Sequence, residues 1–295
     1  SVAAKQYVVN SIKAGQTTEE MISGLSKAPK TISAAAVGMK ALATAGSMVA
    51  MWAISKAVSG IYNLTQEDKN LKEFTVECGR PDSITSEKLQ TMKTYDVTRI
   101  SINPQSMNDE TLQKIGRNHN VQDIIDTFHL AREIGFDNIN MDIILGLVDE
   151  NLDMVRNTLD KIKELSPESL TVHTLAVKRT SKLKENLEDY ELAQYEEMVK
   201  MISLAKEYAS DMGLNPYYMY RQKHMLGNLE NIGYAKEGYE CIYNMQIMEE
   251  KQSNYALGAG SITKFVYPDE DRIERVENVK NVEQYIDRVD EMIER

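Results

Sequence analysis

The chain has 295 residues, with 34 Lys and Arg against 45 Asp and Glu, and a formal net charge of -11 at pH 7. Hydrophobic residues make up 42% and charged residues 27%, which is typical of a globular chain and excludes a disordered one. The acidic balance argues against nucleic acid as a partner, because displacing counterions from phosphates needs clustered Lys and Arg.

Cysteine is rare in this sequence. Cys78 and Cys241 are the two cysteines, and they stand far apart, so they form neither a CxxC pair nor a disulfide framework. This usage, together with the absence of a secretory signal at the start, predicts a cytoplasmic protein. The longest uncharged apolar stretch, residues 41–55, is shorter than the roughly 20 residues that a spanning helix needs.

Residues 1–70 differ in character from the rest. They are rich in Ala, Ser, Gly and Met, contain no Arg, and carry a helical stripe through Leu42, Ala45, Met48 and Trp52. We interpret them as an apolar helical segment that packs against a partner surface. The alternative is a membrane-associating segment, since residues 45–55 resemble apolar stretches of phage tail tape-measure proteins; we do not favour membrane contact.

Beyond residue 70, short β-rich runs alternate with helical patterns. Strands are predicted at 74–78, 98–103, 138–146 and 169–177, with helices at 86–95, 109–135 (interrupted near 117–120) and 152–165 between them. This order predicts right-handed βαβ units, and hence an α/β fold with a parallel sheet.

The last part of the chain has a different pattern. A helix near 192–202 precedes a strand at 217–220, antiparallel strand candidates at 243–249, 256–260 and 263–267, and a final amphipathic helix over 282–293. We therefore predict three regions: a helical appendage at 1–70, a β/α region at 71–215 and an α+β module at 216–295.

Polar residues occupy the ends of the predicted parallel strands, where a β/α barrel builds its active site. Asp142 is the most informative, because a carboxylate within Asn-Met-Asp-Ile-Ile is costly to bury without a partner. The set comprises Glu77, Asn103, Gln105, Asn140 and Asp142. Together they predict a ligand site.

Several segments carry a family resemblance, in the same order along the chain. They include Phe74-Thr-Val-Glu-Cys-Gly-Arg-Pro-Asp82, Arg99-Ile-Ser-Ile-Asn-Pro-Gln105, Asn138-Ile-Asn-Met-Asp-Ile-Ile-Leu-Gly146 and Tyr217-Tyr-Met-Tyr-Arg221. These segments resemble the radical S-adenosylmethionine (radical SAM) enzymes of the oxygen-independent coproporphyrinogen III oxidase family, most closely the HemZ type. The resemblance covers about residues 71–295.

The resemblance implies a radical SAM (β/α) barrel, here incomplete, and an activity in haem biosynthesis. In that family a [4Fe-4S] cluster and S-adenosylmethionine generate a 5′-deoxyadenosyl radical. The radical leads to oxidative decarboxylation of coproporphyrinogen III propionates to vinyl groups, giving protoporphyrinogen IX. The implied partners are the tetrapyrrole substrate and an electron donor.

The resemblance also implies roles for individual residues. Glu77 would accept hydrogen bonds from the methionine ammonium or a ribose hydroxyl, Arg117 would bind a carboxylate, and Asp142 would hold a ribose hydroxyl. Gln105 joins this cofactor-binding set, while Tyr218, Tyr220 and Arg221 are candidates for contact with a tetrapyrrole carboxylate. No catalytic residue is assigned.

One departure from the family is decisive. The family's Cys-x3-Cys-x2-Cys motif stands before the counterpart of Phe74, where this chain has residues 1–70, so the cluster ligands are absent and no metal site is predicted. We expect the chain to be inactive alone, with the strand at Phe74 as an unpaired edge.

Two alternatives stay open. One is a cluster-free tetrapyrrole or haem-binding protein, with His119, His129, His173 and His224 as candidate axial ligands. The other is a chimeric fusion in which residues 1–70 dominate and the remainder is a non-catalytic passenger.

Overall fold

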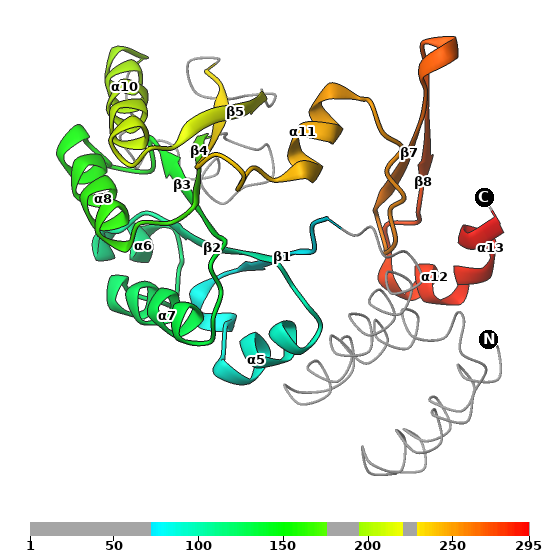
Figure 1. Cartoon of the computed structure of the whole chain (residues 1–295), viewed down its shortest axis with the longest axis horizontal. Helices are drawn as coiled ribbons and strands as arrows, with labels where there is room; N and C mark the ends of the chain where they lie inside the picture. Colours follow the sequence, from blue (N-terminus) through cyan, green and yellow to red (C-terminus); the bar gives the residue numbers. More distant parts are fainter. Residues whose placement is uncertain (1–71, 176–194, 221–228, 295) are drawn as a thin grey trace. The chain divides into compact units, whose positions relative to one another are not determined.

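The computed structural model describes residues 72–175, 195–220 and 229–294 (Figure 1). Two compact units divide the chain: Lys72–Glu249 forms one, and the residues from Glu250 onward belong to the other. The predicted three-region division stays a proposal. The sheet, however, continues past residue 215, the predicted end of the β/α region.

The larger unit is built on one six-stranded sheet with the order β1-β2-β3-β4-β6-β5. The first four strands are parallel, as predicted, and β6 pairs antiparallel with both β4 and β5. Their bounds are β1 Thr75–Gly79, β2 Arg99–Gln105, β3 Ile139–Leu145, β4 Ser169–Thr174, β5 Asn215–Tyr220 and β6 Asn231–Ala235. Among the described residues, β1 is an edge strand.

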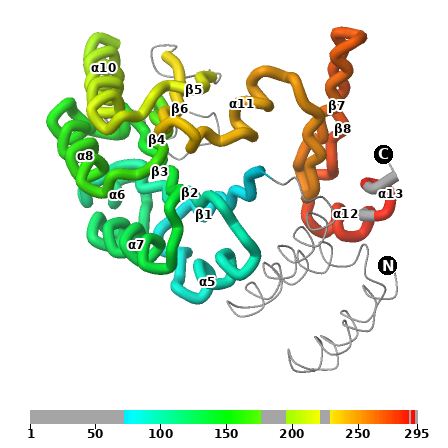
Figure 2. Tube along the Cα trace, in the orientation of Figure 1, coloured from blue at the N-terminus to red at the C-terminus, as the bar shows by residue number. Residues whose placement is uncertain are grey.

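Helices connect the parallel strands and lie along one side of the sheet (Figure 1). The chain trace in Figure 2 shows how β1, β2 and β3 each lead into a helix and then back to the sheet. The helices are α5 Ser86–Thr94, α6 Asp109–Lys114, α7 Val121–Glu133, α8 Leu152–Leu165 and α10 Tyr195–Asp211, with a short 3-10 turn at Pro81–Ser83. Side-chain caps fix several helix starts: Asn120 and Asp123 form a capping box at α7, and Asn151 caps α8.

Alternation along the strands separates two faces of the sheet. Ile100, Met141 and Leu170 have no exposed surface and form the core with Leu89 of α5 and Phe128 of α7. The positions between them are mostly polar on β1 to β4, with Ile144 of β3 as an exception. The helices therefore cover an apolar face, and the opposite face carries the polar side chains.

Several predicted elements after residue 240 are wrong. The segment predicted as a strand at 243–249 is helix α11, Ile242–Glu249, whose Met, Gln and Glu residues favour helix. The one predicted at 256–260 is a turn, in which Gly258 and Gly260 have φ of 119° and 73°. These left-handed conformations interrupt an extended strand.

The smaller unit contains a hairpin of β7, Ile262–Tyr267, with β8, Arg272–Glu277, and two short helices, α12 Val282–Asp287 and α13 Val289–Glu294. The strand predicted at 263–267 is confirmed, whereas the single predicted final helix is divided at Arg288. In the part of the chain that the structure describes, no helix has the length and apolar character needed to cross a bilayer.

Candidate functional site

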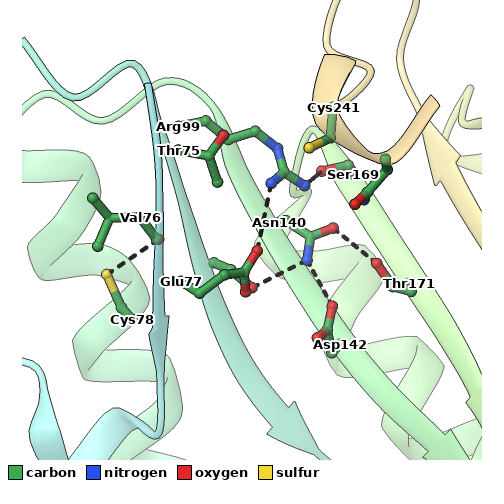
Figure 3. A network of polar contacts seen from close by, with 12 residues as sticks. Thr75, Val76, Glu77, Cys78, Arg99, Asn140, Asp142, Ser169, Thr171 and Cys241 are labelled. Atoms are coloured by element: carbon green, nitrogen blue, oxygen red, sulfur yellow. Dashed lines mark hydrogen bonds and ion pairs between the residues drawn. The ribbon is translucent and has the colours of Figure 1, made fainter. Parts of the chain in front are cut away.

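Asn140 joins three strands on the polar face of the sheet (Figure 3). Its amide nitrogen donates to Ser101 Oγ on β2 at 3.2 Å and to Asp142 Oδ1 at 2.7 Å. Its amide oxygen accepts a hydrogen bond from Thr171 on β4 at 3.2 Å. Because Asn140 is only 3% exposed and all these groups are paired, the network fixes the orientation of the Asp142 carboxylate.

A second chain of contacts starts from the same carboxylate. Asp142 Oδ2 lies 3.6 Å from His173 Nε2, and His173 Nδ1 lies 3.2 Å from the Tyr220 hydroxyl. The Asp142 and His173 side chains are 16% and 24% exposed, so a ligand can reach this part of the face. The structure thus connects a predicted cofactor residue, Asp142, to a predicted substrate residue, Tyr220.

Tyr218 lies flat across β6. A Cβ built on Gly233, its cross-strand neighbour, would fall 1.9 Å from the Tyr218 ring, so only glycine leaves room for it. The ring is nearly parallel to that of Tyr220, with an interplanar angle of 4°. Burial raises the pKa of the Tyr218 hydroxyl, which keeps it protonated.

Glu77 on β1 is the second carboxylate of this face. Its side chain is 63% exposed, and Oε1 lies 3.9 Å from Nη1 of the buried Arg99. Surrounding protein raises the pKa of Glu77 by desolvation, and the charge of Asp142 raises it further, while hydrogen bonding to Ser101 opposes the shift. Two carboxylates on one face favour a ligand with positive charge and hydroxyl groups.

The other predicted cofactor residues lie outside this network. Gln105 is the half-buried last residue of β2, with a left-handed φ of 69° beyond an irregularity in the β2–β3 register. Arg117 lies between α6 and α7; burial and the nearby Arg80 lower its pKa, and the charge of Asp82 opposes them. Arg221 lies outside the described residues.

Sequence reasoning missed Arg99, Ser101 and Thr171 as members of the site, and it considered His173 only as a candidate haem ligand. Each stands two residues from another polar side chain on its own strand, as Ser101 does from Asn103. Applying this period of two backward from the strand ends would have found them.

The two cysteines do not fit a [4Fe-4S] cluster, which requires three thiolates in the family's arrangement. Cys78 Sγ donates to the Val76 carbonyl and lies 3.8 Å from Met92 Sδ, and burial raises its pKa to about 12. Cys241 donates to Glu73, and burial raises its pKa to about 11. Both are thiols at neutral pH, and the described residues contain no group of three or more His, Cys, Asp or Glu side chains that could hold a metal ion.

Comparison with known proteins gives a consistent result. A family model described as the radical SAM superfamily matches residues 54–162. The oxygen-independent coproporphyrinogen-III oxidase-like protein HemZ of Bacillus subtilis is 47% identical over 222 residues, which is 75% of this chain and 44% of that protein. The heme chaperone HemW of the same organism is 28% identical over 210 residues, covering 70% of this chain and 52% of HemW.

Among solved structures, coproporphyrinogen III oxidase (HemN) from Escherichia coli matches with a TM-score of 0.57 at 19% identity, covering 79% of this chain and 54% of HemN. This likeness shows the radical SAM fold. The chain spans about half the length, or less, of these relatives. The sequence matches and the fold agree: the chain belongs to the radical SAM superfamily and, within it, to the HemZ type of coproporphyrinogen oxidase-like proteins.

Proposed function

We propose that this chain carries the S-adenosylmethionine-binding surface of a HemZ-type coproporphyrinogen oxidase-like protein and binds the ligand without a cluster. The observation that carries the proposal is the Asn140 network, which holds the Asp142 carboxylate on the polar face with Glu77 on the same face. S-adenosylmethionine offers an ammonium group and a ribose diol, the two chemistries that paired carboxylates bind best.

Different residues of the chain would contact different groups of the ligand. Asp142 would accept hydrogen bonds from the ribose hydroxyls, and Glu77 would accept them from the ammonium group. Arg117 would pair with the ligand carboxylate, and Gln105 would complete the set from the end of β2. In the superfamily, bound S-adenosylmethionine supplies a 5′-deoxyadenosyl radical when a [4Fe-4S] cluster is present.

The activity that we propose for the whole protein is the oxidative decarboxylation of coproporphyrinogen III propionates in haem biosynthesis, with an electron donor as partner. Tyr218, Tyr220 and Arg221 would face the tetrapyrrole. Because the cysteines of this chain do not fit the cluster, we expect no turnover from the chain alone. The reaction would need thiolates from elsewhere.

Calorimetric titration of the purified chain with S-adenosylmethionine tests this proposal. We expect saturable binding that Asp142→Asn weakens about tenfold or more, since a charge-assisted hydrogen bond is lost. The matched control Asp153→Asn, an exposed acid on α8, leaves the affinity unchanged. Absence of saturable binding by the wild-type chain would overturn the proposal.

A second candidate function is haem binding, favoured by the 28% identity to HemW, whose name describes a heme chaperone. Of the candidate histidines, His173 has a partly exposed side chain on the polar face, whereas the His119 side chain is fully buried. His224 lies outside the described residues. A haem titration that gives a Soret shift lost in His173→Ala would support this function, and an unshifted Soret band would exclude it.

A further inference from the structure

Arg99, the first residue of β2, is a buried cation on the polar face. Only 1% of the surface of Arg99 is exposed to solvent. Nη2 donates to Ser169 Oγ at 3.3 Å, but Nε and Nη1 have no hydrogen-bond partner among the described residues. A buried guanidinium with two unpaired N–H groups is costly, so a role beyond packing is expected of it.

The groups around Arg99 identify its electrostatic partner. Burial raises the pKa of Tyr217 and of Cys241, which both face Arg99, so both are neutral. Glu73 forms no ion pair with Arg99 in the described part of the chain; its carboxylate accepts hydrogen bonds from Cys241 Sγ and the Ile242 amide. Glu77, with Oε1 at 3.9 Å from Arg99 Nη1, is the carboxylate left to balance the charge.

Opposing influences act on Glu77 from the neighbouring strands. Desolvation favours the protonated form of Glu77, and so does the negative charge of Asp142 on β3. Asp142 in turn lies beside His173 on β4. Arg99, Ser101 and Asn103 on β2 favour the ionised form. On β1 itself Cys78 is a neutral thiol. Arg99 is thus the one cation in this set, and it acts through Glu77 because its own N–H groups are buried away from any ligand.

We infer that Arg99 is a positioning residue of the cofactor surface, keeping the Glu77 carboxylate ionised on the polar face where it accepts a ligand ammonium group. The inference rests on the proposed function for the identity of the ligand. Its electrostatic part concerns Glu77 alone and can be measured without a ligand. Arg99 thereby sets the lower pH limit at which the surface can bind an amine.

The experiment is a pH titration of the full chain labelled with ¹³C at the Glu side-chain carboxyls. The Glu77 signal is identified by its loss in Glu77→Gln. Arg99→Gln removes the charge but can still donate to Ser169, and we expect it to move the Glu77 midpoint to higher pH. Arg99→Lys keeps a cation, farther from Glu77, and moves the midpoint in the same direction by less.

Binding of S-adenosylmethionine is then measured over the same pH series. We expect Arg99→Gln to weaken binding about tenfold at the acid end and much less at the alkaline end, because the loss follows the ionised fraction of Glu77. A purely structural role would weaken binding equally at every pH. If Arg99→Gln does not fold, Arg99→Lys carries the comparison.

The two proposals fail in different ways. An unchanged Glu77 midpoint in folded Arg99 variants overturns the role of Arg99, whatever the binding data show. A wild-type chain that binds no S-adenosylmethionine at any pH overturns the proposed function. The ¹³C titration still decides the role of Arg99 in that case.

Discussion

At the scale of single residues, Glu150 gives the protein a pH-dependent stability. The residue is 5% exposed, and its carboxyl accepts hydrogen bonds from the Ser106 hydroxyl and the Leu147 amide, both at 3.3 Å. Burial raises the pKa of Glu150 from 4.5 to about 7, so the folded state holds a proton that the unfolded state has released. Its stabilising effect is complete below pH 4.5 and is lost as the pH rises through about 7.

We therefore predict that Glu150→Gln, which stays neutral, becomes more stable relative to wild type as the pH rises. The difference in free energy of unfolding should change by about 3 kcal/mol between pH 4.5 and about pH 8, as urea denaturation at the two pH values would show. The exposed acid in Asp153→Asn serves as the control and should give almost no such change. Parallel pH profiles for wild type and Glu150→Gln would contradict the prediction.

The individual site residues were predictable to different extents. Asp142 and Glu77 stand out because each carboxylate interrupts a strand pattern. Arg99 does not stand out in the sequence, because its role depends on side chains from other strands and elements. These are Ser169 on β4, two strands away, to which it donates a hydrogen bond, and the buried Tyr217 and Cys241. Such relations follow from strand register, which the hydrophobic pattern of one strand does not specify.

At the scale of elements, the pairing of β5 with β6 depends on Gly233. A methyl group there would overlap the Tyr218 ring, so we predict that Gly233→Ala displaces the ring and costs about 1–3 kcal/mol in free energy of unfolding. Urea denaturation gives the cost, and near-ultraviolet circular dichroism reports the tyrosines. In a Tyr218→Ala background the cost should largely disappear, whereas in a Tyr220→Ala background it should persist. An equal cost in both backgrounds would rule out this packing.

Elements with a clear period were predicted well, and those without one were not. Helices α5 to α8 and strands β1 to β4 match because long-range βαβ packing and local pattern agree. The sequence Asn231-Ile-Gly-Tyr-Ala235 was missed as a strand, since it is short and contains a central glycine; its partners β4 and β5 stabilise it. The alternating apolar residues of 243–249 suit a strand equally well, so this short segment could not be assigned from its pattern; in the structure it is helix α11, and its Asn244 donates a hydrogen bond to Tyr217 of β5.

At the scale of the whole molecule, the main hydrophobic cluster of the described residues lies within the larger unit, whereas the smaller unit buries Tyr285 and Ile286 separately. All buried members of the main cluster fall between Ile84 and Tyr234, inside Lys72–Glu249. A unit with its own closed core can unfold as one cooperative body. Residues 72–249 expressed alone should therefore fold, and their thermal midpoint should lie within a few degrees of the main transition of the full chain.

Calorimetry of the two proteins tests this expectation, with circular dichroism to verify that the isolated unit contains both helix and strand. The control is Leu159→Ala, which removes a fully buried side chain of α8 and should lower the main transition equally in both proteins, at a cost of about 2–5 kcal/mol. A much lower midpoint for the isolated unit would mean that its stability depends on the rest of the chain. Strand β1, which is at the edge of the sheet formed by the described strands, would then be the first place to look for that dependence.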